Sequence, residues 1–251
     1  NVACYLVAQM KPWYKYCFLV FLPVVCHAAP TNRETRFGAI WAPAKEKVPA
    51  LQQDAKRGDM EASFRVGMYY MFRNDCPSQL LSQRPKSIDD NAQTDADSKD
   101  ANLASETLPF DAQFSCDPQE AIQWLRPAAL CGHLDAQYYL GYAYDELGRR
   151  ELAVGWYAVS AVRGHYLGQV SYGVERIAGY ATPKDIVQAY QWAYLAYEGG
   201  YSRDNPVHTP WKKRMTLEQI DEAEKNIQAW KDLRKAGNWN GSWPACESFK
   251  G

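Results

Sequence analysis

The feature that most constrains this chain is a short frame of residues around tryptophan that occurs three times. The three tryptophans lie 156−124 = 32 and 192−156 = 36 residues apart. Self-similarity at a period in the thirties is the signature of stacked two-helix units, and it argues against a domain with one central core. The copies read Ala121-x-x-Trp124-x-x-x-Ala128, Ala153-x-x-Trp156-x-x-x-Ser160 and Ala189-x-x-Trp192-x-x-x-Ala196.

A second series of small residues accompanies the tryptophans. Gly132, Ala136 and Gly141 form its clearest copy, and Gly58…Ala62…Gly67 forms a degenerate first copy. Small side chains let two helices approach closely, while large ones fill the space between layers. The glycine that follows each tryptophan helix suits a left-handed C-terminal cap. We therefore assign structural repeat roles to Gly132, Ala136, Gly141, Trp124, Trp156 and Trp192.

The motif resembles the Sel-1-like repeat family, a relative of the tetratricopeptide repeat. The residues that carry the resemblance are Gly132-His133-x-x-Ala136-x-x-x-Leu140-Gly141-x-x-Tyr144, continuing into Ala153-x-x-Trp156-x-x-x-x-Ala161-x-x-Gly164. It covers residues 55–200 apart from one long insertion, and 215–223 look like the closing helix of such arrays. The resemblance implies an all-α fold, a right-handed α-solenoid of stacked helix-turn-helix repeats. Arg176 departs from the motif, which has tyrosine there.

Apolar periodicity predicts a solenoid over residues 45–236. Between its first two full helices lies an insertion, residues 77–115, whose Ser-, Asp-, Gln- and Asn-rich composition predicts disorder. Residues 30–44 are expected to be extended, and 237–251 to form an irregular tail. The predicted helices span residues 59–73, 118–130, 134–147, 150–163, 166–178, 184–198 and 216–236, with a weaker one at 45–57.

Residues 1–29 read as a signal peptide at about 10–29 with residues upstream of it. Lysines near Met10 precede a short apolar run, Cys17–Cys26, and Ala28 and Ala29 offer cleavage sites. The run is shorter than the roughly 20 residues of a membrane span. We expect an exported bacterial protein, periplasmic or secreted. Lipidation of Cys26 is less favoured because Val25 precedes it, and a buried N-terminal helix is the other alternative.

Of the seven cysteines, four lie beyond the signal segment. An even number in an exported chain suggests disulfides, and four cysteines allow three pairings. Cys76 and Cys116 stand at the two ends of the insertion, so that pair is favoured; Cys131 with Cys246 follows by elimination. Free buried thiols are the alternative.

No catalytic motif is present, so we predict no catalytic residues, no metal site and no cofactor. A formal charge of −1 gives no field for nucleic acid. His133 and His165 occupy equivalent repeat positions, which favours a turn or packing role. The acidic run in the insertion has Asp100 where a calcium loop requires glycine.

Two tyrosine pairs at i, i+4 spacing are the candidates for a binding groove: Tyr138 with Tyr142, and Tyr190 with Tyr194. The expected function is a non-catalytic protein–protein interaction scaffold or adaptor with a protein or peptide partner. The alternative is a cell-wall or β-lactam hydrolase, which the resemblance to cysteine-rich members of the family implies.

Overall fold

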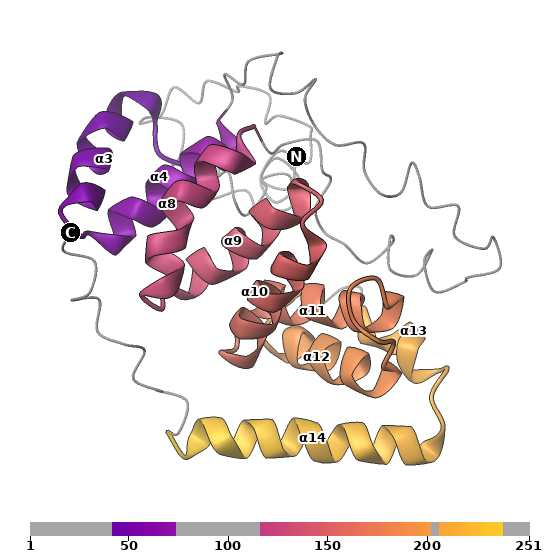
Figure 1. The fold of residues 1–251 in the computed structure, drawn as a ribbon. Helices are drawn as coiled ribbons and strands as arrows, with labels where there is room; N and C mark the ends of the chain where they lie inside the picture. The colour runs from indigo at the N-terminus through magenta and orange to yellow at the C-terminus, as the bar shows by residue number, and fades with distance from the viewer. Residues whose placement is uncertain (1–41, 74–115, 202–205, 238–251) are drawn as a thin grey trace, which may run out of the picture. The chain divides into compact units, whose positions relative to one another are not determined.

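The computed structural model describes residues 42–73, 116–201 and 206–237, and these residues form helices and turns only. Figure 1 shows the helices following one another in chain order. After a short 3-10 turn (Lys45–Lys47), they are α3 (Val48–Lys56), α4 (Met60–Phe72), α8 (Pro118–Leu130), α9 (Leu134–Glu146), α10 (Arg150–Val162), α11 (Tyr166–Ala178), α12 (Ile186–Glu198), α13 (His208–Lys212) and α14 (Leu217–Lys235).

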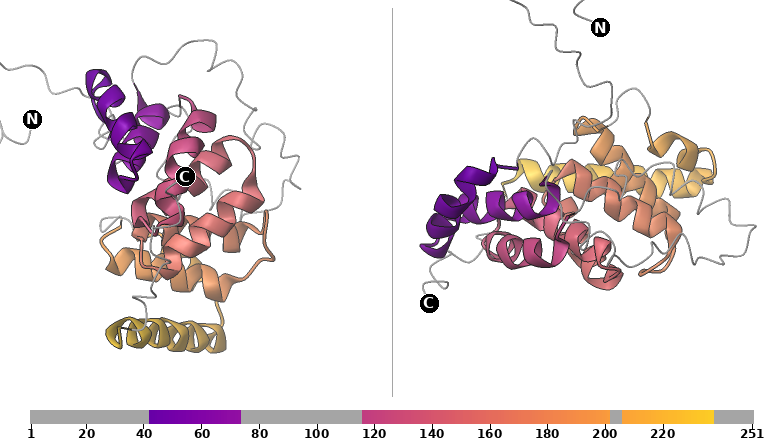
Figure 2. Two further views of the ribbon diagram at one scale, coloured as in Figure 1. Left: turned by 60° about the vertical axis from the view of Figure 1, so that its left-hand side comes forward. Right: turned by 90° about the horizontal axis from the view of Figure 1, so that it is seen from above.

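The helices pack as three successive pairs: α4 with α8, α9 with α10, and α11 with α12. Neighbouring pairs meet through α8 with α9 and α10 with α11, so from α4 to α12 each helix contacts the next along the chain. At the two ends, α3 packs on α4 and α14 packs on α12, as the two views in Figure 2 also show. This arrangement confirms the predicted all-α solenoid of stacked helix-turn-helix repeats.

Several predictions fall on residues that lie outside the described ranges. The signal segment 1–29, most of the extended segment 30–44, the insertion 77–115 and nearly all of the tail 237–251 belong to this group. These predictions stay predictions.

Two glycines reverse the chain between successive pairs. Gly132 and Gly164 have φ angles of 84° and 89°, in the left-handed region that residues with a Cβ rarely adopt. The next helix begins two residues later in both cases. The repeated glycine of the sequence motif is therefore the point at which one layer ends and the next begins.

Close helix packing explains the small residues within the layers. A Cβ atom added to Gly141 would lie 2.9 Å from Cδ1 of Tyr157 and 3.1 Å from the carbonyl oxygen of Ala153. Ala136 is completely buried. Each of these positions sits where α9 contacts a neighbouring helix, so a larger side chain would force the helices apart.

The three repeat tryptophans do not share one environment. Trp192 is buried, and its ring lies edge-on to Trp230 of α14, with 6.4 Å between ring centroids. Trp124 and Trp156 are only half-buried. Trp124 packs on the small cluster that Val48 of α3 helps to form. Equivalent positions thus differ according to which helix covers them.

Backbone hydrogen bonds fix the point where the chain returns from the insertion. The Cys116 amide donates to the Met71 carbonyl at 2.8 Å, and the Asp117 amide donates to the Tyr70 carbonyl at 2.9 Å. The Arg73 side chain approaches the buried Cys116 sulfur, with 3.0 Å between Nε and Sγ. The end of α4 and the start of α8 are thereby joined directly. Cys76 lies outside the described residues, so its bridge to Cys116 stays a prediction.

Candidate functional site

The predicted groove tyrosines of α9 are buried, so that part of the groove prediction is wrong. Tyr138 is 2% exposed and Tyr142 is 5% exposed. Tyr138 stacks on His165 at 4.9 Å, and Tyr142 stacks on Phe72 at 6.3 Å between ring centroids. Because α9 lies between two other helix pairs, its tyrosine face is filled by aromatic rings of both neighbours.

The second tyrosine pair is covered by the connector that follows α12. Tyr190 is 2% exposed and Tyr194 is half-buried. The ring of His208, at the start of α13, lies 5.9 Å from Tyr190 and 5.2 Å from Tyr194. Burial lowers the pKa of His208, with the nearby positive charge of Lys212 adding to the effect. The two tyrosines do share a face, as predicted, but that face holds α13 in place.

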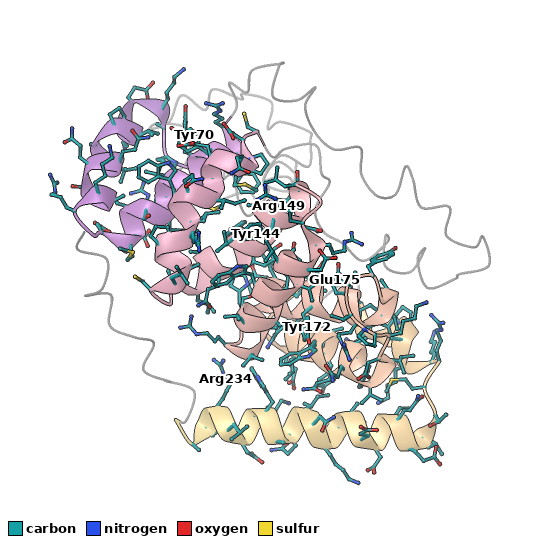
Figure 3. The ribbon with its side chains drawn as sticks, in the orientation of Figure 1. Tyr70, Tyr144, Arg149, Tyr172, Glu175 and Arg234 are labelled. Carbon is teal, nitrogen blue, oxygen red and sulfur yellow. The ribbon has the colours of Figure 1, made fainter. Side chains whose placement is uncertain are left out.

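A different group of residues stands out at the turns that join paired helices. Asp145 near the end of α9, Arg150 at the start of α10, and Glu175 near the end of α11 come together there. The Arg150 Nε atom lies 3.5 Å from Oδ1 of Asp145 and 3.8 Å from Oε1 of Glu175. Tyr180, in the turn after α11, completes what we call the Glu175 cluster. Figure 3 labels Glu175 beside this turn.

Glu175 is a buried carboxyl group whose two oxygen atoms are not both paired. It is 5% exposed, and its Oε2 atom has no hydrogen-bond partner. Burial raises the pKa of Glu175 to about 7; the positive charge of Arg150 acts against this and the negative charge of Asp145 adds to it. The group therefore changes its protonation near neutral pH, whereas an exposed glutamic acid is fully ionised there.

Tyr180 brings the cluster to the surface. Its side chain is among the exposed large hydrophobic groups of the described residues, at 38%. The Arg150 guanidinium lies over the Tyr180 ring, 4.3 Å from the centroid, a distance suited to a cation–π interaction. Arg149, which precedes Arg150 in the chain, is exposed. The exposed Tyr180 ring thus lies against an arginine that forms ion pairs with Asp145 and with ionised Glu175.

The sequence contained a signal for part of the Glu175 cluster. Glu175 stands at the repeat position that is Ala143 in the second copy and Tyr69 in the first, so a carboxyl group replaces residues that are buried. The departure at the next residue, Arg176, was visible in the motif, but Glu175 was missed. Arg176 forms an ion pair with Asp185 at 3.1 Å and so anchors the same turn.

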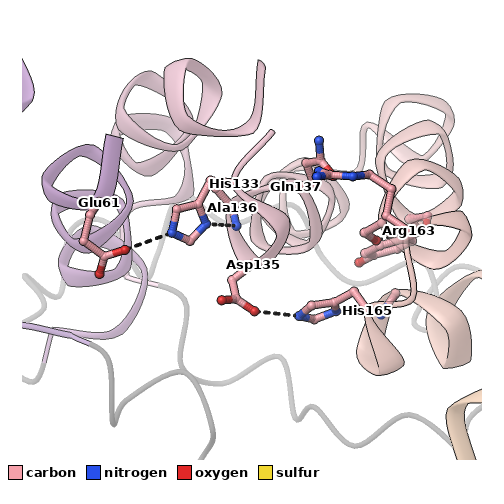
Figure 4. A network of polar contacts seen from close by, with 10 residues as sticks. Glu61, His133, Asp135, Ala136, Gln137, Arg163 and His165 are labelled. Carbon is pink, nitrogen blue, oxygen red and sulfur yellow. Dashed lines mark hydrogen bonds and ion pairs between the residues drawn. The ribbon is translucent and has the colours of Figure 1, made fainter. Parts of the chain in front are cut away.

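His133 and His165 are the N-terminal caps of α9 and α11, at the ends of these helices far from Asp145 and Glu175. Nδ1 of His133 accepts from the Ala136 amide at 3.2 Å, and Nδ1 of His165 accepts from the Gly168 amide at 3.1 Å. Since Nδ1 is the acceptor, Nε2 carries the proton and donates to a carboxylate of the preceding layer, Glu61 or Asp135, at 3.0 Å in both cases (Figure 4). The two histidines thus have a structural role at the turns: each caps its own helix and bonds to the preceding layer.

Buried amide side chains tie the same layers together. Gln137 donates to the Ala129 carbonyl at 3.0 Å, and its equivalent Gln169 donates to the Ala161 carbonyl at 3.3 Å. Arg163 donates to Oε1 of Gln137 at 2.7 Å. These bonds join the helix before each turn to the helix after it. The polar residues of this region serve the stacking of the repeats.

Neither a membrane-spanning helix nor a group of metal-binding side chains occurs among the described residues. None of the described helices is both long and apolar enough to cross a membrane. Over the three described ranges, no group of three or more His, Cys, Asp or Glu residues is placed to hold a metal ion.

No protein-family model and no curated protein matches this sequence. Among solved structures, the chain is similar to a protective antigen that is present in uropathogenic Escherichia coli strains and displays an SLR fold. The two are 22% identical with a TM-score of 0.45, and the match covers 77% of this chain and 42% of the antigen. The chain thus spans less than half of that protein. The fold assignment itself rests on helix packing: the described residues are an all-α solenoid of stacked repeats, and their motif resembles the Sel-1-like repeat.

Proposed function

We propose that this protein is a non-catalytic interaction scaffold that binds a protein or peptide segment at the turn edge around Tyr180. The observation that carries the proposal is the exposed Tyr180 ring on the Arg150 guanidinium. Tyrosine and arginine are the residue types that most often dominate binding energy at protein interfaces. Stacked helix pairs also offer long surfaces for extended partners.

The support from Arg150 makes Tyr180 a suitable anchor. A side chain already held in place loses less conformational freedom when a partner arrives. Asp145 and Glu175 lie within 4 Å of the Arg150 side chain, and the preceding residue, Arg149, is exposed and adds a positive charge to this turn. A partner segment that combines an apolar or aromatic residue with a carboxylate fits this chemistry.

The proposed place of action is the bacterial cell envelope or the exterior, since the apolar run and small residues before position 30 are typical of a signal peptide. Sequencing the N-terminus of the mature protein tests this part. We expect it to begin near Ala28 or Ala29, and a mature chain that keeps residues 18–25 would contradict export by this route. The hydrolase alternative stays a prediction drawn from the resemblance alone.

Binding at the turn edge is tested by cross-linked capture from a cell-envelope extract with the full mature chain as bait. Tyr180→Ser and Arg149→Ser should each reduce capture of the partner that the unaltered chain retains. Leu217→Ser is the matched control, because Leu217 is 81% exposed but lies on α14. Equal capture by Tyr180→Ser and the unaltered chain, with unchanged circular dichroism, would place the binding surface elsewhere.

A further inference from the structure

The three charged residues of the Glu175 cluster each lie at the helix end that disfavours their charge. Asp145 and Glu175 are in the last turns of α9 and α11, where the helix dipole is negative. Arg150 is the first residue of α10, where the dipole is positive. Each charge alone would destabilise its own helix. The charges are therefore compatible with the fold only as a group, and the charge state of each affects the other two.

Arg150 connects the buried Glu175 carboxyl with the exposed Tyr180 ring. Its Nε atom lies 3.8 Å from Oε1 of Glu175, and its guanidinium carbon lies 4.3 Å from the Tyr180 ring centroid. The Nε atom has no hydrogen-bond partner, so its pairing with Glu175 depends on charge. Protonation of Glu175 therefore changes the electrostatic balance next to Tyr180 without breaking a hydrogen bond at this atom.

The proton on Glu175 sets the sum of the charges in the cluster. When Glu175 is ionised, the two carboxylates outweigh Arg150 and leave an excess of negative charge. When Glu175 is neutral, Asp145 alone balances Arg150. Burial favours the neutral form and raises the pKa of Glu175 to about 7, so both forms are populated near neutral pH.

Groups on the helices packed against α11 complete the surroundings of Glu175. The charge of Glu175 acts on Tyr157 of α10, whose burial holds its pKa well above the usual value. Asp185, the N-cap of α12, forms an ion pair with Arg176 at 3.1 Å. These groups therefore keep their charge while Glu175 gains or loses its proton.

We propose, on the basis of the binding role proposed for Tyr180, that binding at the turn edge is linked to a proton on Glu175. A partner segment that carries a carboxylate binds more tightly when Glu175 is neutral. Ionised Glu175 leaves an excess negative charge close to the place of the partner's carboxylate, and like charges repel. The site therefore favours an acidic partner at mildly acidic pH and binds it less tightly as the pH rises.

The expected size of this effect follows from the distance between the two like charges. A partner carboxylate against Tyr180 and Arg150 would lie on the order of 10 Å from Glu175, and such a pair near a protein surface changes affinity about threefold at low salt. Because linkage is reciprocal, a bound acidic partner should make Glu175 keep its proton to a pH about 0.5 units higher.

NMR titration of the full chain with two synthetic peptides at low salt tests the link. Acetyl-Phe-Asp-amide is the acidic probe, and acetyl-Phe-Asn-amide is the matched neutral probe. The acidic peptide should bind about threefold more tightly at pH 6 than at pH 8, whereas the neutral peptide should bind equally at both. Glu175→Gln should remove this pH dependence. Glu222→Gln, at an exposed position on α14, is the matched control and should keep it.

The carboxyl carbon signal of Glu175 gives a second measurement that needs no substitution. Its titration midpoint should rise by about 0.5 pH units with the acidic peptide and stay unchanged with the neutral one. Equal binding of the acidic peptide at both pH values, with binding lost in Tyr180→Ser, would overturn the link and leave the binding site in place. Binding that Tyr180→Ser leaves unchanged, or no binding of either peptide, would overturn the proposed site together with the link.

Discussion

Glu175 shows how one substitution within a repeat gives a layer a property that the other layers lack. Its equivalents, Ala143 and Tyr69, fill the same buried position without charge. The carboxyl group lies near Arg150 of α10, and the charge of Asp145 of α9 also acts on it. Burial in this setting raises the pKa of Glu175 to about 7, so the folded protein binds a proton there that the unfolded chain has already released.

We predict that the free energy of unfolding falls as pH rises through about 7, where folded Glu175 loses its proton. The stability that depends on protonated Glu175 is fully present below pH 4.5, the ordinary pKa of this group in the unfolded chain. It is lost above about pH 7, the pKa of Glu175 in the folded protein. The size of the loss is on the order of 3 kcal/mol. Glu175→Gln should remove this pH dependence in urea unfolding at pH 5 and pH 8.5. Glu151→Gln, at an exposed position on α10, should retain it, and parallel behaviour of the two variants would contradict the prediction.

The repeat tryptophans permit a second residue-scale prediction. Trp192 is buried against α14, whereas Trp156 is half-buried beside exposed Leu152. Replacement by alanine should therefore cost about 3–5 kcal/mol at Trp192 and clearly less at Trp156. Urea unfolding of both variants decides this, and an equal or larger loss at Trp156→Ala would mean that further residues bury it.

At the scale of elements, the capping histidines join helix formation to layer stacking. Each one accepts from an amide in the first turn of its own helix and donates to a carboxylate of the layer before it. The hydrogen bond from His165 lowers the pKa of Asp135. One histidine side chain thus caps the start of its own helix and also holds that helix against the preceding layer.

This double role predicts an energetic coupling between His165 and Asp135. Asn is a good N-cap, so His165→Asn should keep the bond to the Gly168 amide, but its shorter side chain cannot reach Asp135. A double-mutant cycle with Asp135→Ala should then give a coupling of about 0.5–1 kcal/mol, because Asp135 is half exposed. The same cycle with exposed Asp232→Ala is the control, and strictly additive effects for the Asp135 pair would show that the observed contact does not stabilise the fold.

The helices could be predicted because periodicity and capping residues are properties of local sequence. The Glu175 cluster could not be predicted from local sequence. The predicted helix 134–147 differs from α9 by one residue, and its glycine and histidine turn was readable from the motif. Periodicity shows that Tyr138 and Tyr142 share a face, but it cannot show that a neighbouring pair covers that face. α13 is not among the predicted helices, because it has only five residues and Pro206 and Pro210 interrupt the periodicity of that stretch. The Glu175 cluster joins three helices, so only tertiary packing reveals it.

At the scale of the whole molecule, the repeat array tolerates the long insertion because the helices on its two sides pack directly against each other. Residues 74–115 separate α4 from α8 in sequence, yet these two helices pack against each other as a pair. The amides of Cys116 and Asp117 bond directly to the end of α4. The contacts that order this pair therefore lie on the two sides of the interruption.

Deleting residues 80–112 should leave the helical content and the cooperativity of unfolding nearly unchanged. Residues 74–79 and 113–115 would remain to join two chain ends that already touch, and a shorter loop loses slightly less entropy on closure. The variant keeps Cys76 and Cys116, so unfolding with and without a reductant separates the predicted bridge from the deletion. Under oxidising conditions a bridge would add about 4 kcal/mol in the unaltered chain and about 2.5 kcal/mol in the deletion variant, whose closed loop is shorter. Loss of cooperative unfolding in the oxidised deletion variant would mean that the removed residues pack as part of the first layer. Loss only after reduction would instead show that the bridge, together with the hydrogen bonds at Met71 and Tyr70, holds the first pair to the rest of the array.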